Sequence, residues 1–271
     1  MLANILIPVF ALTAMGMWAL VIPGLLTTPV WIVVTHINEP WRPKMSFTLK
    51  RWKEIVDFGK YVLGYELLEK VRANIDYLLI GRILGVEALG IYFFAFNAGL
   101  GISLNVTNIM VWPLYPHLCA ARHNFVEFKQ KYFHSLKTIG LVIIPLVILQ
   151  SSLAPFYVPI VFGQKWTTAV PILVLICLSA IPRPFGTAAA LLLQSLDKAW
   201  INLRWSVLFT GIFVASLLIG MNWDIYGVAV SVLISHAIAM PMFTLWATKF
   251  VFAKDSVAFQ QSEAKVKSSK L

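Results

Sequence analysis

Five ionisable side chains lie close together in a stretch that is otherwise long and apolar enough to cross a bilayer. The stretch is residues 58–85, and its central part carries Glu66, Glu69, Lys70, Arg72 and Asp76. A charge at bilayer depth costs at least about 2.5–3.5 kcal/mol, so such groups normally face protein or a water-filled cavity. These residues are therefore the first candidates for chemistry, namely the binding of an ionic group inside a membrane.

Helical geometry divides this stretch into two sides. At about 100° per residue, one side of the helix carries Glu66, Glu69, Arg72 and Asp76. Lys70 and Asn74 lie beside this charged side. The apolar residues of the other side are Leu67, Leu68, Val71, Ile75, Leu78 and Leu79. Spacings of three and four residues predict ion pairs of Glu66 with Lys70, Glu69 with Arg72 and Arg72 with Asp76.

Two interpretations of the charged side stay open: an ion-pair ladder that locks helices together, or the wall of a hydrophilic translocation cavity. In the second, Lys70 and Arg72 attract an anionic head group, and arginine suits phosphate through its planar fork. Arg183 lies between Pro182 and Pro184, where a break would place a cation within another span. The residues expected to line the cavity and bind substrate are Lys70, Arg72, Asn74 and Arg183. The residues expected to balance charge or take up a proton are Glu66, Glu69 and Asp76.

The composition of the whole chain indicates the protein class. Of its 271 residues, 59% are hydrophobic and only 13% are charged, whereas a soluble domain has about a quarter charged residues. Several uncharged runs exceed the roughly 20 residues that span a hydrocarbon core. The sequence therefore predicts an all-α polytopic membrane protein with about eight transmembrane helices. Their expected ranges are 3–15, 18–35, 58–85, 88–114, 136–153, 169–193, 200–220 and 225–248.

Charge distribution predicts the orientation. Four alternate segments, at 36–60, 118–137, 194–204 and from 249 onward, hold 17 of the 22 Lys and Arg residues. By the positive-inside rule these segments are cytoplasmic, which places both termini in the cytoplasm. Nucleic-acid binding would need basic residues clustered on a folded face, so we expect no nucleic-acid partner.

No pattern in the chain favours catalysis. The sequence contains no nucleophile elbow, P-loop or HExxH motif, and the histidines are scattered. For His236, which falls within a span, a hydrogen bond to a neighbouring helix is favoured over a ligand role. Cys119 and Cys177 have no metal-ligand spacing. We therefore expect no enzyme activity, no catalytic residue, no metal and no cofactor.

Several short motifs resemble the polysaccharide-transporter family. They stand at 16–21 (GMWALV), 41–43 (WRP), 74–85 (NIDYLLIGRILG), 88–92 (ALGIY) and 162–166 (FGQKW). Their order and spacing are similar to those of Wzx-type oligosaccharide flippases, which belong to the superfamily of lipid II flippases and multidrug/toxin extruders of the MATE type. The resemblance covers roughly residues 1–250, and the run at 74–92 is its most specific part.

The resemblance implies two six-helix lobes that rock around a cationic central cavity. It implies alternating access and export of undecaprenyl-diphosphate-linked oligosaccharide across the bacterial inner membrane, for O-antigen, capsule or exopolysaccharide. Implied partners are that lipid-linked oligosaccharide, membrane lipids, and the polysaccharide polymerase and chain-length proteins. Two other functions stay open: drug or cation extrusion, and a non-transporting scaffold of the polysaccharide assembly machinery.

The resemblance also implies a partial transporter. Family members have about twelve to fourteen spans, and residues 58–85 resemble the span that opens their second lobe. We therefore expect 1–36 to be the last two helices of a first lobe and 37–57 to be a basic cytoplasmic linker. Residues 58–250 are then the six-helix second lobe, and 251–271 a disordered basic tail. Transport would be the activity of a longer parent protein.

Overall fold

The structure is a computed structural model that describes residues 18–38 and 52–253, where all regular secondary structure is helical. The chain divides into two compact units, Met1–Trp52 and Lys53–Leu271. The predicted first span, at 3–15, lies outside the described residues. So do residues 39–51 of the predicted linker and residues 254–271 of the predicted tail.

The described part of the first unit is helix α2, Trp18–Asn38, which covers the predicted second span. Pro23 and Pro29 both lie inside this helix. The hydroxyl groups of Thr27 and Thr28 donate hydrogen bonds of 2.8 Å to the carbonyls of Pro23 and Gly24. Side chains of this kind help satisfy backbone groups near prolines in membrane helices.

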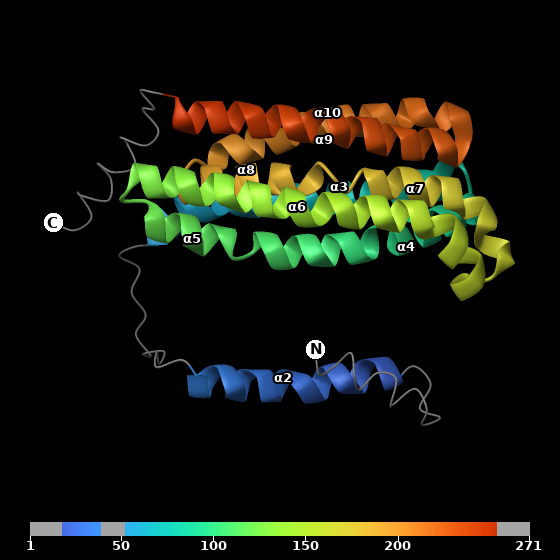
Figure 1. Cartoon of the computed structure of the whole chain (residues 1–271), viewed down its shortest axis with the longest axis horizontal. Coiled ribbons are helices and arrows are strands. Elements are labelled where there is room, and N and C mark those ends of the chain that lie inside the picture. Colours follow the sequence, from blue (N-terminus) through green and yellow to red (C-terminus); the bar gives the residue numbers. More distant parts are fainter. Residues whose placement is uncertain (1–17, 39–51, 254–271) are drawn as a thin grey trace. The chain divides into compact units, whose positions relative to one another are not determined.

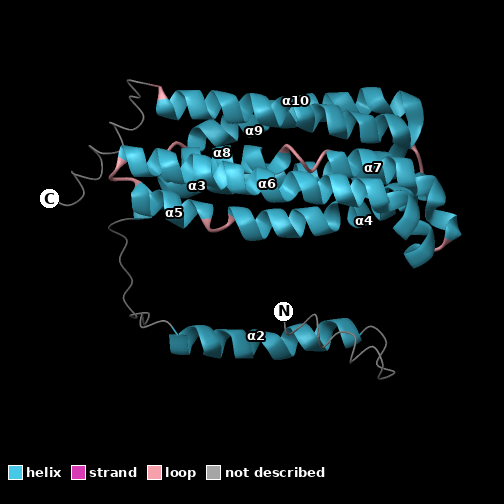
Figure 2. Cartoon of the chain, in the orientation of Figure 1, coloured by secondary structure: helices cyan, strands magenta, loops and turns pink. Residues whose placement is uncertain are grey.

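The second unit contains eight α-helices in its described residues, joined by short loops (Figures 1 and 2). They are α3 (Trp52–Ile83), α4 (Val86–Val111), α5 (Leu114–Ala121), α6 (Phe125–Tyr157), α7 (Val170–Leu178), α8 (Arg183–Ser195), α9 (Ala199–Gly220) and α10 (Asp224–Phe252). Three shorter helical turns connect them: η1 (Val158–Phe162), η2 (Gln164–Ala169) and η3 (Met221–Trp223). In Figure 1, α9 and α10 lie side by side and η3 joins them at one end.

Two predicted interruptions are confirmed. The interruption between the spans predicted at 58–85 and 88–114 is a turn at Gly85, which has φ 93°, a conformation that favours glycine. The predicted break at Pro182 separates α7, which ends at Leu178, from α8, which begins at Arg183. Proline lacks an N–H and cannot continue the hydrogen bonding of α7.

The basic segment at 118–137 is mostly helical, and the connection that it contains is shorter than predicted, at residues 122–124. It contains the end of α5 and the first turns of α6, which begins at Phe125 rather than at 136. Asn124 caps α6 because its side-chain oxygen accepts hydrogen bonds from the backbone N–H groups of Val126 and Glu127. Lys131 pairs with Glu127 at 2.8 Å. Polar sequence can extend a helix beyond the apolar layer when capping and ion pairs support it. The end of α10 likewise extends to Phe252, so residues 251 and 252, predicted as the start of the tail, are helical.

The core of the second unit consists of two apolar clusters. One is built around α4, α6, α7 and the later turns of α9, and includes Ile143, Ile176 and Phe213. The other surrounds α5, α8 and the later turns of α10, and includes Leu118 and Leu193. A Cβ at Gly99 would lie 3.0 Å from the backbone oxygen of a leucine on α7, so this glycine permits close packing of α4 on α7.

Four segments of the described chain are long and apolar enough to cross a membrane: Val86–Ala121, Phe125–Phe162, Gln164–Ser195 and Ala199–Phe252. The last contains both α9 and α10. The charged helix α3 is not among them, because its central turns carry five ionisable side chains. The predicted class, an all-α polytopic membrane protein, is confirmed.

Candidate functional site

A polar cavity of about 160 Å³ lies inside the second unit. Its ionisable lining comes from three helices: Glu69 and Arg72 on α3, Arg183 on α8 and His236 on α10. Along α9 and α10 the lining residues fall between the two apolar clusters. The cavity therefore forms a layer with polar side chains at the junction of the two apolar clusters. It is smaller than the roughly 300–1,000 Å³ of typical ligand pockets, and its size suits water or a small ion.

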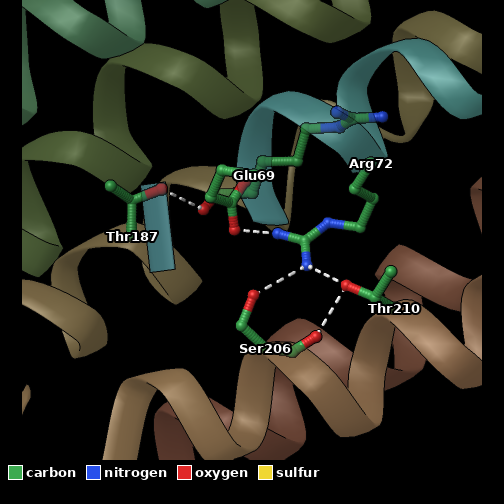
Figure 3. Close-up of polar contacts among 6 residues, drawn as sticks. Glu69, Arg72, Thr187, Ser206 and Thr210 are labelled. Atoms are coloured by element: carbon green, nitrogen blue, oxygen red, sulfur yellow. Dashed lines mark hydrogen bonds and ion pairs between the residues drawn. The ribbon is translucent and has the colours of Figure 1, made fainter. Parts of the chain in front are cut away.

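Arg72 crosses this layer and connects α3 to α9 (Figure 3). Its side chain is only 6% exposed. Its Nη1 donates hydrogen bonds to Ser206 Oγ at 3.2 Å and Thr210 Oγ1 at 3.3 Å. Its Nη2 pairs with Glu69, as predicted. The guanidinium carbon also lies 4.6 Å from the ring centre of Phe209. All these partners belong to the protein, so Arg72 acts here as a cross-link between helices.

Arg183 has a similar local role at the break between α7 and α8. Its Nε donates to the backbone carbonyl of Ser179 and its Nη2 to the Ser179 hydroxyl, both at 3.3 Å. A helix end leaves carbonyl groups without partners inside the helix. The Arg183 side chain therefore satisfies polar groups that the break exposes, and it lines the cavity at the same time.

Asp76 is 2% exposed and is bound by α4 instead of by arginine. Its carboxylate accepts a hydrogen bond of 2.7 Å from the Tyr92 hydroxyl and one of 2.9 Å from the Tyr77 backbone N–H. The ion pairs found among the described residues do not include Asp76. The predicted pair of Arg72 with Asp76 is therefore wrong, because the Asp76 carboxylate is hydrogen-bonded to Tyr92 instead.

Three other predicted site residues, Glu66, Lys70 and Asn74, are exposed and do not line the cavity. The predicted pair of Glu66 with Lys70 is absent from the described part of α3, whose ion pairs are Asp57–Lys60 and Glu69–Arg72. The Asn74 side chain donates to the Lys70 carbonyl at 2.7 Å. At about 100° per residue, Lys70 points roughly 160° away from Arg72 around the helix. The charged residues of α3 therefore form two separate groups, one inside the bundle and one on its outer surface.

His236 forms its hydrogen bond within its own helix, so the expected bond to a neighbouring helix is wrong. Its Nδ1 lies 2.9 Å from the Val232 carbonyl and must donate, because a carbonyl only accepts. The ring packs edge-on against Phe209 and Phe213, each with a centroid distance of 5.4 Å. His236 is thus a buried residue in the wall of the cavity.

Sequence reasoning missed Tyr92, Ser206 and Thr210 as partners of the charged helix. One signal was available for the last two, which stand four residues apart in an apolar run and so share one helix face. Nothing in the spacing of the chain pointed to Tyr92. Among the described residues, no group of three or more His, Cys, Asp or Glu side chains could hold a metal.

Removal of the Tyr92 hydroxyl should destabilise the bundle. In Tyr92→Phe the buried Asp76 carboxylate keeps only one donor, and losing a hydrogen bond to a charged group costs about 1.5–3 kcal/mol. We expect the half-unfolding temperature in detergent to fall by about 3–8 °C. Tyr226→Phe is the matched control, because the Tyr226 hydroxyl is exposed and 3.5 Å from its acceptor. Equal unfolding temperatures for the two variants would contradict a role for Tyr92 in holding Asp76.

Residues 1–171 of the chain match the family described as polysaccharide biosynthesis protein. The teichuronic acid biosynthesis protein TuaB of Bacillus subtilis is 30% identical over 62% of this chain. The lipopolysaccharide biosynthesis protein WzxC of Escherichia coli is 24% identical over 66%, and the succinoglycan biosynthesis transport protein ExoT of Rhizobium meliloti is 22% identical over 66%. The matched region spans only 35% to 37% of the length of these relatives.

The fold is similar to a solved structure described as MATE in the straight conformation. The two agree with a TM-score of 0.71 at 16% sequence identity, over 98% of this chain and 61% of that one. This likeness supports the helical architecture alone.

Proposed function

Because the chain belongs to the polysaccharide biosynthesis protein family, we propose that it is part of a transporter that flips undecaprenyl-diphosphate-linked oligosaccharide by alternating access. The membrane would be the bacterial inner membrane, and the product O-antigen, capsule or exopolysaccharide. The names of its relatives support this class of function, since one is a succinoglycan biosynthesis transport protein. The charge distribution of the chain supports cytoplasmic termini.

The observation that carries the proposal is the outer polar group of α3: Glu66, Lys70 and Asn74. Lys60 and Arg82 are about 33 Å apart along the helix at about 1.5 Å per residue, close to the roughly 30 Å of a hydrocarbon core. Lys70 falls near the middle of that interval and is exposed on the bundle surface. An exposed charge at this depth disfavours contact with lipid tails. The outer polar group therefore supports a water-filled space beside α3.

We propose that Lys70 and Asn74 meet the anionic head group first. Lys70 has no carboxylate partner in the described part of the chain, and its ammonium group is free to bind phosphate. Arg72 and Arg183 line a cavity too small for an oligosaccharide. We propose that these two arginines reach the substrate only when alternating access opens that cavity. Glu66, Glu69 and Asp76 would then balance their charge.

The full-length transporter of which this chain is a part should restore polymer export in a strain lacking its own flippase, and Lys70→Ala in that transporter should reduce the export. One charge-assisted contact contributes about 1.5–3 kcal/mol, and 1.4 kcal/mol corresponds to tenfold. We therefore expect an export rate about tenfold lower. Lys129→Ala, which removes an exposed lysine from α6, should export at the parental rate. Protein in the membrane fraction is quantified for each variant, so that a folding defect is not read as a transport defect.

Other outcomes would assign a different function. If Lys70→Ala exports at the parental rate, Lys70 does not bind the substrate. Inhibition of export by hydrophobic cations would favour drug or cation extrusion. If neither the parent nor any variant exports polymer, but the parent still pulls down the polymerase and chain-length proteins, a non-transporting scaffold would be favoured. We propose these proteins as partners of the transporter in either case.

A further inference from the structure

A second hollow lies on the outer surface of the bundle, at the end where α9 begins and α10 ends. It is an open groove of about 490 Å³ and does not depend on the proposed transport activity. The residues used in the argument below are Trp200, Arg204, Trp205, Leu208, Trp246 and Phe250. All of them lie between 199 and 252, the last segment long and apolar enough to cross a membrane.

Aromatic rings from both helices line this groove and stack through Phe243, which is not itself part of the lining. Trp205 on α9 stacks on Phe243 of α10 with a centroid distance of 5.0 Å. The stack continues from Phe243 to Trp246 at 6.4 Å and from Trp246 to Phe250 at 5.3 Å, with interplanar angles of 16° and 12°. Trp246, Phe250 and Leu208 are exposed large hydrophobic residues. A stacked aromatic wall is already ordered, so an apolar chain could lie on it without rearranging the protein.

A positively charged side chain, that of Arg204, lies at this groove. The guanidinium of Arg204 lies 4.7 Å from the ring centre of Trp200. Arg204 is exposed and takes part in none of the ion pairs found in the described part of the chain. Lys249, which is also exposed, lies three residues after Trp246 and directly before Phe250 on α10. The apolar groove therefore has positive charge near it, and no carboxylate among the described residues pairs with that charge.

We propose that this groove binds one anionic phospholipid, with an acyl chain along the aromatic wall and the phosphate on Arg204. Arginine binds phosphate through two parallel N–H donors. Lys249 adds a second positive charge that favours an anionic over a zwitterionic head group. Tryptophan and arginine commonly lie at the membrane interface, where the head groups are. Trp205 lines both the groove and the polar cavity. A lipid here would therefore contact α9, the helix whose hydroxyl groups accept hydrogen bonds from Arg72.

The test is native mass spectrometry of the purified chain with phosphatidylglycerol or with phosphatidylcholine of the same acyl chains. We expect one retained phosphatidylglycerol per chain and weaker retention of phosphatidylcholine. Arg204→Gln should bind phosphatidylglycerol about tenfold more weakly, as expected for loss of one charge-assisted contact. The affinity of Arg204→Lys for phosphatidylglycerol should fall between those of the parent and Arg204→Gln. Arg82→Gln, which removes an exposed arginine from α3, is the matched control and should bind like the parent.

A second variant keeps the test independent of Arg204. Leu208→Trp fills the groove from an exposed position and should reduce phosphatidylglycerol retention while leaving the unfolding temperature unchanged. Unchanged retention in both Arg204→Gln and Leu208→Trp would overturn the proposal, as would equal binding of phosphatidylcholine. Displacement of phosphatidylglycerol by equimolar undecaprenyl phosphate would also overturn it and assign the groove to the transport substrate.

Discussion

Replacing Arg72 by methionine is expected to lower the half-unfolding temperature in detergent by about 5–10 °C. Methionine keeps most of the apolar stem but leaves Glu69, Ser206 and Thr210 without their shared donor. Breaking a fully buried ion pair costs about 3–5 kcal/mol. Because the Glu69 side chain is 37% exposed, water compensates part of the loss and we expect about 2–3 kcal/mol.

The comparison that isolates this effect is Arg82→Met on the same helix. Arg82 is exposed and forms no ion pair within the described residues, so its loss should change the temperature by less than about 2 °C. Glu69→Gln combined with Arg72→Met should recover part of the stability, since it removes the unpaired carboxylate. A single Arg72→Met variant as stable as the parent would mean that Arg72 does not cross-link α3 and α9.

The second large effect is expected at the corner between α9 and α10. A Cβ added at Gly227 would collide with the Gly220 carbonyl and would lie 2.8 Å from Trp223 Cβ. A Cβ added at Gly220 would lie 2.6 Å from the Gly227 carbonyl, so the contact is tight in both directions. Backbone atoms cannot move aside as a flexible side chain can. Gly227→Ala should therefore force the two helices apart, at a cost of about 1–3 kcal/mol or about 3–8 °C in the half-unfolding temperature.

Gly211→Ala on α9 provides the opposite control. Nothing lies within 4 Å of a Cβ built at Gly211, and alanine favours helix over glycine by about 0.8–1.0 kcal/mol. This variant should be as stable as the parent or slightly more stable. If Gly227→Ala behaves like Gly211→Ala, the close approach at the corner is not required for the fold.

Local sequence was sufficient to predict the class of fold. Apolar runs of membrane-spanning length, the break before Arg183 and the turn at Gly85 depend on residues near one another in the chain. The pair of Glu69 with Arg72 is of the same kind, because it joins residues three apart on one helix. These features follow from helix geometry and from the conformational limits of proline and glycine.

The partners of the charges were decided by tertiary structure. Arg72 binds Ser206 and Thr210, which are 134 and 138 residues away, and Asp76 binds Tyr92 of the next helix. Helical periodicity groups side chains on faces but does not say which face meets protein. Packing of α3 on α4 and α9 turned Arg72 and Asp76 inward and left Lys70 outside. The sequence by itself therefore determined a helical membrane protein with one strongly charged helix, and only the packed bundle decided which charges hold helices together.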